Sequence, residues 1–330
     1  MHFDTRINAE VATMGKWSFA KLFKSFELYR KYKAVIKKEQ PELILVPISQ
    51  TTMGFVKDAP FIRIGTKYAK VVVQLRGSNF KNWLAASGSF TNSFVTKTLK
   101  KCAGVIVLGN NLTHLFEAYF TGEQIFVVPN GGDYELQTKK ETELTILYLA
   151  NFLPSKSFDD VLKALVILKE KGITNFKMNA AGAWDNETFK QKCLAIIADN
   201  QLDNVTLFKP QAGEAKMQLF ANADVFVFCP KMPEGHPWVI VEAMANGLPV
   251  IATDQGAIIE SVIDGENGFI VPAEQPLIIA EKLEQLINDS ALRVQFSQQS
   301  KASYQTNFTE EKMVENLKGV FDAVLEGDFI

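Results

Sequence analysis

Two glutamates stand eight positions apart in the stretch PEGHPWVIVEAM, residues 233–244. Glu234 directly precedes Gly235, whereas Glu242 is the only charged residue between Gly235 and Thr253 when His236 is neutral. Burying a carboxylate without a partner costs on the order of several kcal/mol. Glu242 therefore requires a cation, or a ligand whose hydroxyl groups donate to it.

The elements around this stretch predict where the two carboxylates lie. ADVFVFCP is typical of a buried strand, KMPEGHP of a loop, and WVIVEAMAN of a helix that starts after Pro237 and ends at Gly247. Glu234 is then on the loop at the carboxyl end of a strand, and Glu242 is one to two turns inside the helix on the same side of the domain.

This arrangement is suited to a nucleotide. The backbone amides around Gly235, His236 and Trp238 form the positive end of the helix dipole, which can hold a phosphate. A carboxylate can accept two hydrogen bonds from a ribose diol. The alternative makes Glu242 the partner of a lysine and Glu234 an ordinary surface residue. Either glutamate alone favours this alternative, whereas the pair, with Gly and Pro between them, favours the nucleotide.

Strands of continuous apolar type alternate with helices along most of the chain, which predicts α/β domains with parallel sheets covered on both faces. The predicted strands are PELILVPI, KVVVQL, GVIVLG, QIFVVPN, LTILYLA, FKMNAAG, NVTLFKP, ADVFVFCP, LPVIATD and GFIVP. FVTKTLKKC and LTHLFEAYF are predicted helices of the first half, and the segment after about Pro276 is largely helical. The polar segment 131–143 reads as a linker between two domains, and ligands are expected at the carboxyl ends of the strands.

Composition excludes several classes of protein. The three cysteines form no CxxC pair and the three histidines have no ligand spacing, which indicates a reduced cytoplasmic protein without a metal. No apolar run approaches the roughly 20 residues of a membrane span, and the N-terminus does not resemble a signal peptide. No GxGxxG follows a strand, which argues against a dehydrogenase, and no nucleic-acid-binding motif is present.

The charge is unevenly distributed. Residues 1–101 contain 18 Lys and Arg against 6 Asp and Glu, and the remainder contains 17 against 31, so the two parts carry about +12 and −14. Such an excess is often just a solvated face, but it can also attract an anionic membrane or a lipid-linked acceptor. The helix predicted from Trp17 to Ile36 suits either a sheet or a membrane surface. Its apolar face consists of Phe19, Leu22, Phe23, Phe26, Tyr29 and Ile36.

The segment EGHPWVIVEAMANGLPVIATDQGAIIESVIDGENGFIVP closely resembles the E-x7-E region of glycosyltransferase family 4. Weaker similarity extends over the rest of residues 41–330, including the Asn-Gly turn of IFVVPNGGD. The resemblance implies the GT-B fold, in which two Rossmann-like domains face each other across a cleft. We expect an acceptor-side domain at 1–135, a nucleotide-sugar-binding domain at 136–308, and a helix at 309–330 that packs back on the first domain.

The resemblance also implies roles for individual residues. Glu234 matches the residue that contacts the donor sugar near the reacting carbon, and Glu242 the one that binds the ribose hydroxyls. Lys156 matches a lysine that grips the diphosphate and is assigned with Glu234 to catalysis. The remaining donor-binding residues are expected to be Asn151, Gly182, Lys209, Pro210, Gly235, His236 and Pro237. The acceptor side is expected at Arg76, Gly77, Ser78 and Asn79.

Three departures from the family pattern concern function. Asn151 stands where the family has an arginine beside the diphosphate, and Arg76 stands in a stretch where members commonly have histidine. Arginine can hold a phosphate but does not readily shuttle protons. The sequence also lacks the hydrophobic strand and glycine-rich turn with which members open. We therefore expect an N-terminal domain without its first strand or strands, either in a shortened protein or in a sequence that omits them.

The function that these patterns predict is transfer of a sugar, with retention, from a UDP- or GDP-sugar to a hydroxyl of a glycan or lipid-linked acceptor in polysaccharide or cell-envelope synthesis. No cofactor or metal is expected, and the enzyme would be cytoplasmic or peripheral at the inner face of the membrane. Two alternatives stay open. One is a UDP-sugar epimerase of the same fold, and the other is a non-catalytic subunit that binds nucleotide sugar.

Overall fold

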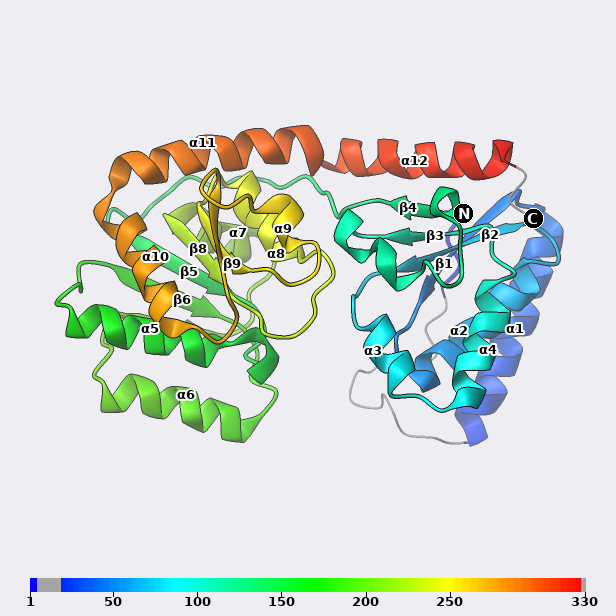
Figure 1. Cartoon of the computed structure of the whole chain (residues 1–330), viewed down its shortest axis with the longest axis horizontal. Coiled ribbons are helices and arrows are strands. Elements are labelled where there is room, and N and C mark those ends of the chain that lie inside the picture. Colours follow the sequence, from blue (N-terminus) through cyan, green and yellow to red (C-terminus); the bar gives the residue numbers. More distant parts are fainter. Residues whose placement is uncertain (5–18, 328–330) are drawn as a thin grey trace. The chain divides into compact units, whose positions relative to one another are not determined.

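The computed structural model describes residues 1–4 and 19–327, with side chains from residue 25 onward in the second of these ranges. The chain divides into two compact units, which are coloured along the sequence in Figure 1. The first unit comprises residues 1–107, 113–127 and 317–330, and the second comprises residues 108–112 and 128–316.

The first unit contains a parallel sheet whose strands follow one another in sequence order, β1-β2-β3-β4. These strands are β1 (Leu43–Ile48), β2 (Lys70–Leu75), β3 (Gly104–Val107) and β4 (Ile125–Val127). The inner strands β2 and β3 are almost wholly buried, as a sheet covered on both faces requires. β1 lies at an edge and contains Pro47, which has no N–H to contribute to a further strand.

Helix α1 (Phe19–Glu39) packs against α2 (Thr52–Gly65) rather than covering the sheet alone. The rings of Tyr29 and Tyr32 each meet Phe61 of α2 edge-on at 5.0 Å, and Ile36 is buried. Phe26, one turn earlier, is 64% exposed, so its predicted place on the buried face is wrong because the contact with α2 does not cover it. Trp17 and the side chains of Phe19, Leu22 and Phe23 lie outside the described residues.

The helices of this unit are α1 (Phe19–Glu39), α2 (Thr52–Gly65), α3 (Phe80–Ala85) and α4 (Ser89–Leu99), with a short 3-10 helix η3 (Gly122–Gln124).

The α-helix predicted at LTHLFEAYF, residues 112–120, is wrong. The structure has a 3-10 helix, η2 (Asn110–Leu115), followed by hydrogen-bonded turns. The Glu260 carboxylate accepts hydrogen bonds from the backbone N–H groups of Asn110 and Asn111 at 2.9 and 2.7 Å. This tertiary anchor holds the start of the segment, and the chain there tightens into i to i−3 bonds in place of a regular α-helix.

The second unit contains a six-stranded parallel sheet in the order β10-β9-β8-β5-β6-β7. β5 pairs with β6 on one side and with β8 on the other, so the strand order reverses between β5 and β8. The strands are β5 (Thr145–Leu149), β6 (Lys177–Ala181), β7 (Val205–Phe208), β8 (Val225–Phe228), β9 (Val250–Thr253) and β10 (Gly268–Val271). In open α/β sheets such a reversal opens a crevice at the carboxyl ends of the strands.

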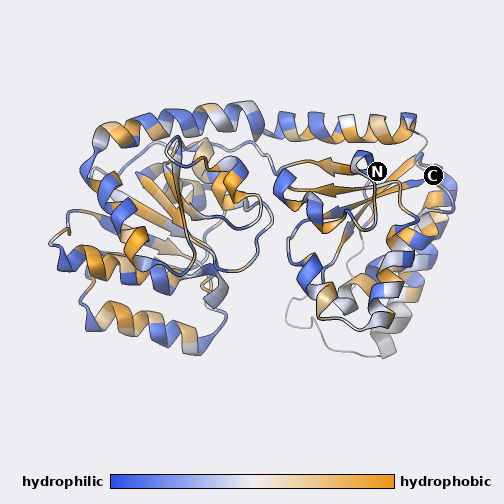
Figure 2. Ribbon diagram, viewed as in Figure 1, coloured by the Kyte–Doolittle hydropathy of each residue, from blue (hydrophilic) through white to orange (hydrophobic). Residues whose placement is uncertain are grey.

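Two apolar cores cover the two faces of this sheet. On β5, Ile146 and Tyr148 belong to one core and Leu147 to the other, as the alternation of side chains along a strand requires. Figure 2 shows the strands in the colours of hydrophobic residues and the helices with mixed faces. The long helices are α5 (Phe158–Glu170), α6 (Glu187–Asp199), α7 (Gly213–Asn222), α8 (Trp238–Ala245), α10 (Pro276–Asn288), α11 (Ser290–Asn307) and α12 (Glu310–Glu326). The short ones are α9 (Ile258–Ser261) and the 3-10 helix η4 (Pro154–Lys156).

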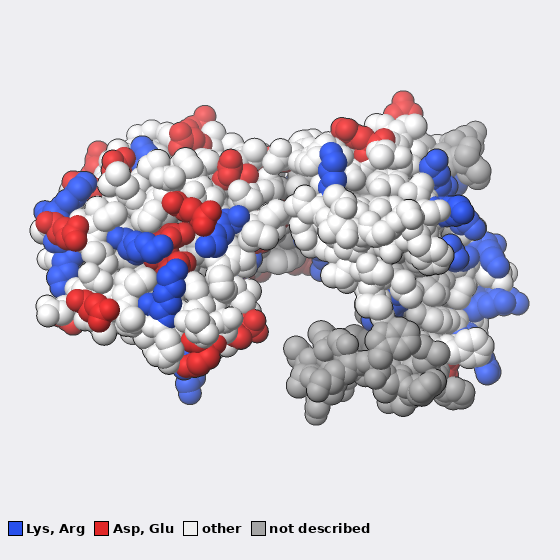
Figure 3. Space-filling view, turned by 60° about the horizontal axis from the view of Figure 1, so that its bottom comes forward, with Lys and Arg blue, Asp and Glu red and all other residues white. Residues whose placement is uncertain are grey.

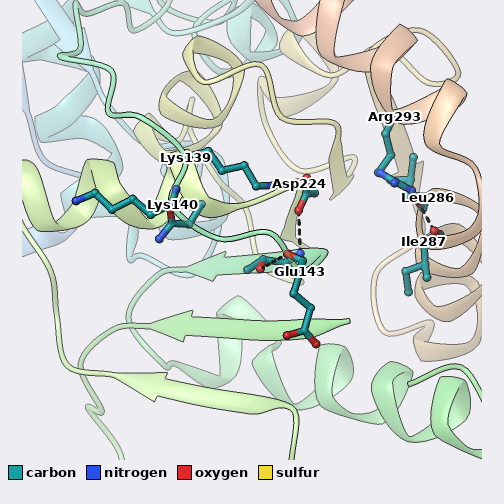
Figure 4. Close-up of polar contacts among 9 residues, drawn as sticks. Lys139, Lys140, Glu143, Asp224, Leu286, Ile287 and Arg293 are labelled. Atoms are coloured by element: carbon teal, nitrogen blue, oxygen red, sulfur yellow. Dashed lines mark hydrogen bonds and ion pairs between the residues drawn. The ribbon is translucent and has the colours of Figure 1, made fainter. Parts of the chain in front are cut away.

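The linker that precedes β5 is fixed to the second unit by Asp224, at the start of β8 (Figure 4). Its carboxylate accepts a bond from Lys139 Nζ at 2.5 Å and one from the backbone N–H of Thr145 at 2.9 Å. The N–H of Lys140 donates to the side-chain oxygen of Asn222 at 2.9 Å. These contacts align β5 with β8, the two strands between which the order reverses.

The last part of helix α12 belongs to the first unit, where it is bonded to β2. Lys70 Nζ, at the start of β2, donates to the carbonyl oxygens of Val324, Leu325 and Gly327 at 3.0, 3.3 and 2.7 Å. An ammonium group at the end of a helix satisfies carbonyls that have no partner within the helix and complements the helix dipole. Among the helices of the described chain, none has both the length and the apolar character that crossing a membrane requires.

Candidate active site

Lys156 and Glu234 meet at the carboxyl ends of β5 and β8. Lys156 closes η4, which follows β5, and Glu234 lies on the loop between β8 and α8. The Lys156 ammonium forms an ion pair with the Glu234 carboxylate, with the two side chains 22% and 15% exposed. The same ammonium lies 5.4 Å from the ring centroid of Phe228. The structure therefore places a cation and an anion together at the point where the strand order reverses.

The loop that carries Glu234 is held by the end of β9 and the segment after it. The N–H of Ala257 donates to Gly235 O at 2.9 Å, and Thr253 Oγ1 donates to Pro230 O at 2.6 Å. Gly256 has φ +61°, and a Cβ atom at this position would lie 1.8 Å from Glu234 O. Only glycine tolerates both the backbone conformation and the close approach, so this residue sets the position of the Glu234 backbone.

Glu242 is buried in α8 and paired on one side only. Its Oε1 accepts a bond from Lys216 Nζ of α7 at 2.5 Å. Its Oε2 is buried and has no hydrogen-bond partner within the described residues. Burial raises the pKa of the Glu242 carboxyl, and Lys216 acts in the opposite direction. The lysine partner considered from the sequence thus exists, and the second carboxylate oxygen has no partner among the described residues.

The His236 ring is occupied by contacts within the protein. Its Nδ1 accepts a bond from the N–H of Asn130 at 2.9 Å, and its Nε2 lies 2.6 Å from Ser261 Oγ. Because Nδ1 must be an acceptor, the neutral ring carries its proton on Nε2 and donates it to Ser261. The ring also packs against Phe308, with the centroids 5.3 Å apart. Both ring nitrogens are therefore occupied by protein groups. The predicted contact of His236 with a donor substrate is restricted to its backbone.

The loop containing Asn130 depends on glycine as well. A Cβ on Gly131 would lie 2.4 Å from Thr309 O, and the N–H of Gly132 donates to Phe308 O at 3.0 Å. Tyr304 Oη donates to Gly132 O at 2.8 Å. The segment that follows β4 and the end of α11 are therefore bonded together beside His236.

Asn151 and Gly182 lie next to each other at the ends of β5 and β6. Asn151 is exposed, and its side-chain oxygen accepts a bond from the N–H of Ala183 at 3.3 Å. A Cβ on Gly182 would lie 2.0 Å from Ala150 O, so glycine allows these two loops to touch. Lys209 and Pro210 are exposed directly after β7, which is an edge strand two positions from β5. No contact in the described structure joins them to Lys156 or Glu234.

The predicted acceptor residues follow β2 in the first unit. Arg76 is exposed, and the N–H of Asn79 donates to Oε1 of Gln50 at 2.8 Å. A Cβ on Gly77 would lie 2.3 Å from Nε2 of Gln50, and Ser78 Oγ is buried without a partner among the described residues. The four residues thus form one loop that is braced by the loop after β1.

Sequence reasoning missed Gln50 and Lys216. The isolated Glu242 signalled that a cation was needed, but nothing in the sequence selects Lys216, 26 residues earlier, from the other lysines. Within the described residues, His, Cys, Asp and Glu form no cluster of three or more that could hold a metal ion.

Comparisons with known proteins agree with this fold. The family model described as "Glycosyl transferases group 1" matches residues 134–303. The capsular polysaccharide biosynthesis glycosyltransferase CapM of Staphylococcus aureus is 27% identical over 244 residues, which cover 74% of this chain and 62% of that protein. The chain thus spans less than two thirds of that relative.

Solved structures extend the similarity to both units. A glycosyltransferase from Rickettsia africae has a TM-score of 0.78 at 18% identity, covering 95% of this chain and 84% of that one. The Anabaena protein Alr3699/HepE, solved with UDP, has a TM-score of 0.76 at 18% identity, covering 90% and 82%. The predicted α/β class with two Rossmann-like domains is confirmed.

The buried His236 predicts a loss of stability in acid. Burial lowers the pKa of His236 from 6.5 to about 4, so the unfolded chain takes up a proton at a higher pH than the folded chain. The free energy of unfolding should therefore fall as the pH drops from about 6.5 to about 4, by roughly 2–3 kcal/mol at 1.36 kcal/mol per pKa unit.

Urea unfolding of the wild type and of His236→Phe, which keeps a ring against Phe308 but cannot titrate, separates this loss from that of the carboxylates. The wild type should lose more stability than the variant over this pH range. Equal losses would contradict the assignment.

Proposed function

The chain belongs to the glycosyl transferases group 1 family, and we propose that it transfers a sugar, with retention, from a nucleotide-diphosphate sugar to a hydroxyl of a glycan or lipid-linked acceptor. The observation that carries the proposal is the pair of carboxylates at the carboxyl edge of the second sheet. One is Glu234, paired with Lys156, and the other is Glu242, with a buried oxygen that has no partner among the described residues.

In this proposal the nucleoside diphosphate lies along the carboxyl ends of β5 and β8. The 2′- and 3′-hydroxyl groups of ribose donate to Glu242 Oε2, which satisfies the buried oxygen. The diphosphate lies at the positive end of α8, beside Gly235 and the backbone of His236. Asn151 and Gly182, which lie together at the ends of β5 and β6, border the same site. UDP and GDP are the two nucleotides that we propose as carriers.

Lys156 and Glu234 exchange partners when the donor binds. Without donor, the ammonium of Lys156 is neutralised by Glu234. With donor, Lys156 turns to the diphosphate and stabilises the negative charge that develops as the sugar–oxygen bond breaks. Glu234 is then free to hold a sugar hydroxyl or to stabilise positive charge at the reacting carbon. Asn151, which has no charge, leaves this electrostatic task mainly to Lys156 and to backbone amides.

The reaction forms one bond and breaks one bond at the same carbon. The bond from the anomeric carbon to the phosphate oxygen breaks, and its electron pair leaves with the diphosphate. The acceptor hydroxyl attacks from the same face, and its proton passes to an oxygen of the departing phosphate. Arg76 and the loop to Asn79 would hold the acceptor, with Arg76 serving as an anion ligand rather than as a base.

Peripheral contact of the first unit with an anionic membrane or lipid-linked acceptor is a further part of the proposal. Figure 3 shows Lys and Arg side chains along one edge of this unit, at the right of the view, with few acidic groups among them. Several large apolar side chains of the unit are exposed, namely Phe26, Met53, Val56 and Phe90. A basic surface with exposed apolar residues is suited to an anionic lipid surface.

Substitution of the two glutamates tests the division of roles. Glu242→Ala should weaken UDP or GDP binding by about tenfold or more, because it removes hydrogen bonds to a charged acceptor. Glu234→Ala should bind the nucleotide at least as tightly as the wild type, since Lys156 no longer has to leave a carboxylate, but should lose turnover by roughly 100-fold. Calorimetry and a transfer assay measure the two effects. Unchanged nucleotide binding by Glu242→Ala would end the assignment of Glu242.

Lys156→Ala tests the contact with the diphosphate. The variant should lose affinity for UDP by about tenfold or more and keep its weak affinity for uridine, because the lysine contacts the charged group alone. Lys171→Ala is a matched control, since Lys171 pairs with Glu284 at the other side of the second unit. Equal losses for UDP and uridine, or the same loss in the control, would remove Lys156 from the phosphate site.

Co-sedimentation with vesicles tests the membrane contact. The wild type should bind anionic vesicles at about 50 mM salt and be released at about 0.5 M, because screening weakens surface electrostatics. Phe26→Ser should weaken this binding, and Leu277→Ser, which alters a similarly exposed apolar residue of α10 in the second unit, should not. Absence of binding at low salt would exclude this part of the proposal.

A further inference from the structure

The Lys216–Glu242 pair joins two helices of the second unit. Lys216 lies in the first turn of α7 and Glu242 in the middle of α8, and their side chains meet at 2.5 Å. The Glu242 residue is 7% exposed, and the Lys216 side chain is 22% exposed. Both side chains are therefore largely withdrawn from solvent, which screens the pair only in part.

Glu242 has a second oxygen that the protein does not use. Oε2 is buried and has no hydrogen-bond partner within the described residues, although ionised carboxylates normally accept several bonds. The arrangement is asymmetric, with one oxygen held by a cation and the other free to accept. A ligand with adjacent hydroxyl groups satisfies Oε2 only while the carboxyl group is ionised, because a protonated group is a weaker acceptor and in part a donor.

The surroundings of Glu242 offer little else to keep it ionised. On the linker, Tyr134 Oη is buried without a partner among the described residues, and burial and the Glu242 carboxylate raise the pKa of the Tyr134 phenol. On α11, Tyr304 bonds to Gly132, and the Lys301 side chain packs at Gly247, past the end of α8. On α9, Glu260 is engaged by Asn110 and Asn111. Burial raises the pKa of the Glu242 carboxyl, and Lys216 is the group that opposes this rise.

We propose that Lys216 is a positioning residue of the ribose subsite, which fixes one oxygen of Glu242 and keeps the carboxylate ionised so that the other oxygen accepts the ribose hydroxyls. This inference rests on the proposed function, because it takes Glu242 as the ribose ligand. Lys216 acts through Glu242 and does not touch the sugar that is transferred. If Lys216 has this role, the affinity for the ribose is independent of pH in the wild type and depends on pH when the lysine is removed.

The test compares UDP binding by the wild type, Lys216→Met, Lys216→Arg and a matched control, Lys171→Met. Isothermal calorimetry is carried out from about pH 6 to about pH 8.5, a range in which buried glutamates without a cation partner titrate. At the lower pH, Lys216→Met should bind UDP about tenfold more weakly than the wild type, since a neutral acceptor forms hydrogen bonds of roughly half the strength. Its affinity should recover as the pH rises. Lys216→Arg and Lys171→Met should follow the wild type.

Adding Glu242→Gln to Lys216→Met gives a second, direct readout. If Glu242 is the titrating group, the double variant should bind weakly at every pH, and its stability should lack the pH dependence that Lys216→Met shows in urea unfolding without nucleotide. If Lys216→Met bound UDP with wild-type affinity, or with an affinity loss that is the same at every pH, the role of Lys216 would be overturned and the proposed function would not be affected. If the wild type bound neither UDP nor GDP, the proposed function would be contradicted, and so would the ribose subsite that rests on it.

Discussion

The reversal of strand order between β5 and β8 is the constraint on which the site depends. Because these two strands are neighbours while their following loops lead to different helices, η4 and the loop before α8 both begin at the same edge of the sheet. Lys156 and Glu234 come from these two loops and meet there. The result is an ion pair of two partly buried side chains, in which each charge is balanced by the other.

The loop carrying Glu234 is positioned by contacts that converge on its neighbour His236. Asn130, Ser261 and Phe308 surround the imidazole, and each comes from a different part of the second unit. The neutral ring can satisfy an N–H donor on one side and a hydroxyl on the other only in one tautomer. Gly256 adds the close backbone approach on the other side of Glu234. The backbone of the loop that carries Glu234 is thus held by buried, uncharged contacts, and the ion pair with Lys156 holds its side chain.

Most of the fold could be predicted from the sequence, because continuous apolar strands and amphipathic helices carry their own patterns. All ten predicted strands are present. The segment 112–120 could not be predicted correctly, since Glu260, far away in sequence, fixes the start of η2. The same limit applies to the site. Glu242 can be singled out in the sequence because it is the one charged residue in an apolar stretch. The contact with Lys216 and the ring contacts of His236 form only when the chain folds, and spacing along the sequence does not specify them.

In the proposed complex, Glu242 holds the ribose of a nucleotide while Lys156 holds its diphosphate. A crystal structure of the protein with UDP or GDP tests this most directly. We expect ribose hydroxyls at about 2.6–3.2 Å from Glu242 Oε2, Lys216 still bonded to Oε1, and the Lys156 ammonium turned from Glu234 to a phosphate oxygen. A nucleotide bound elsewhere, or bound here with Oε2 still without a partner, would contradict it.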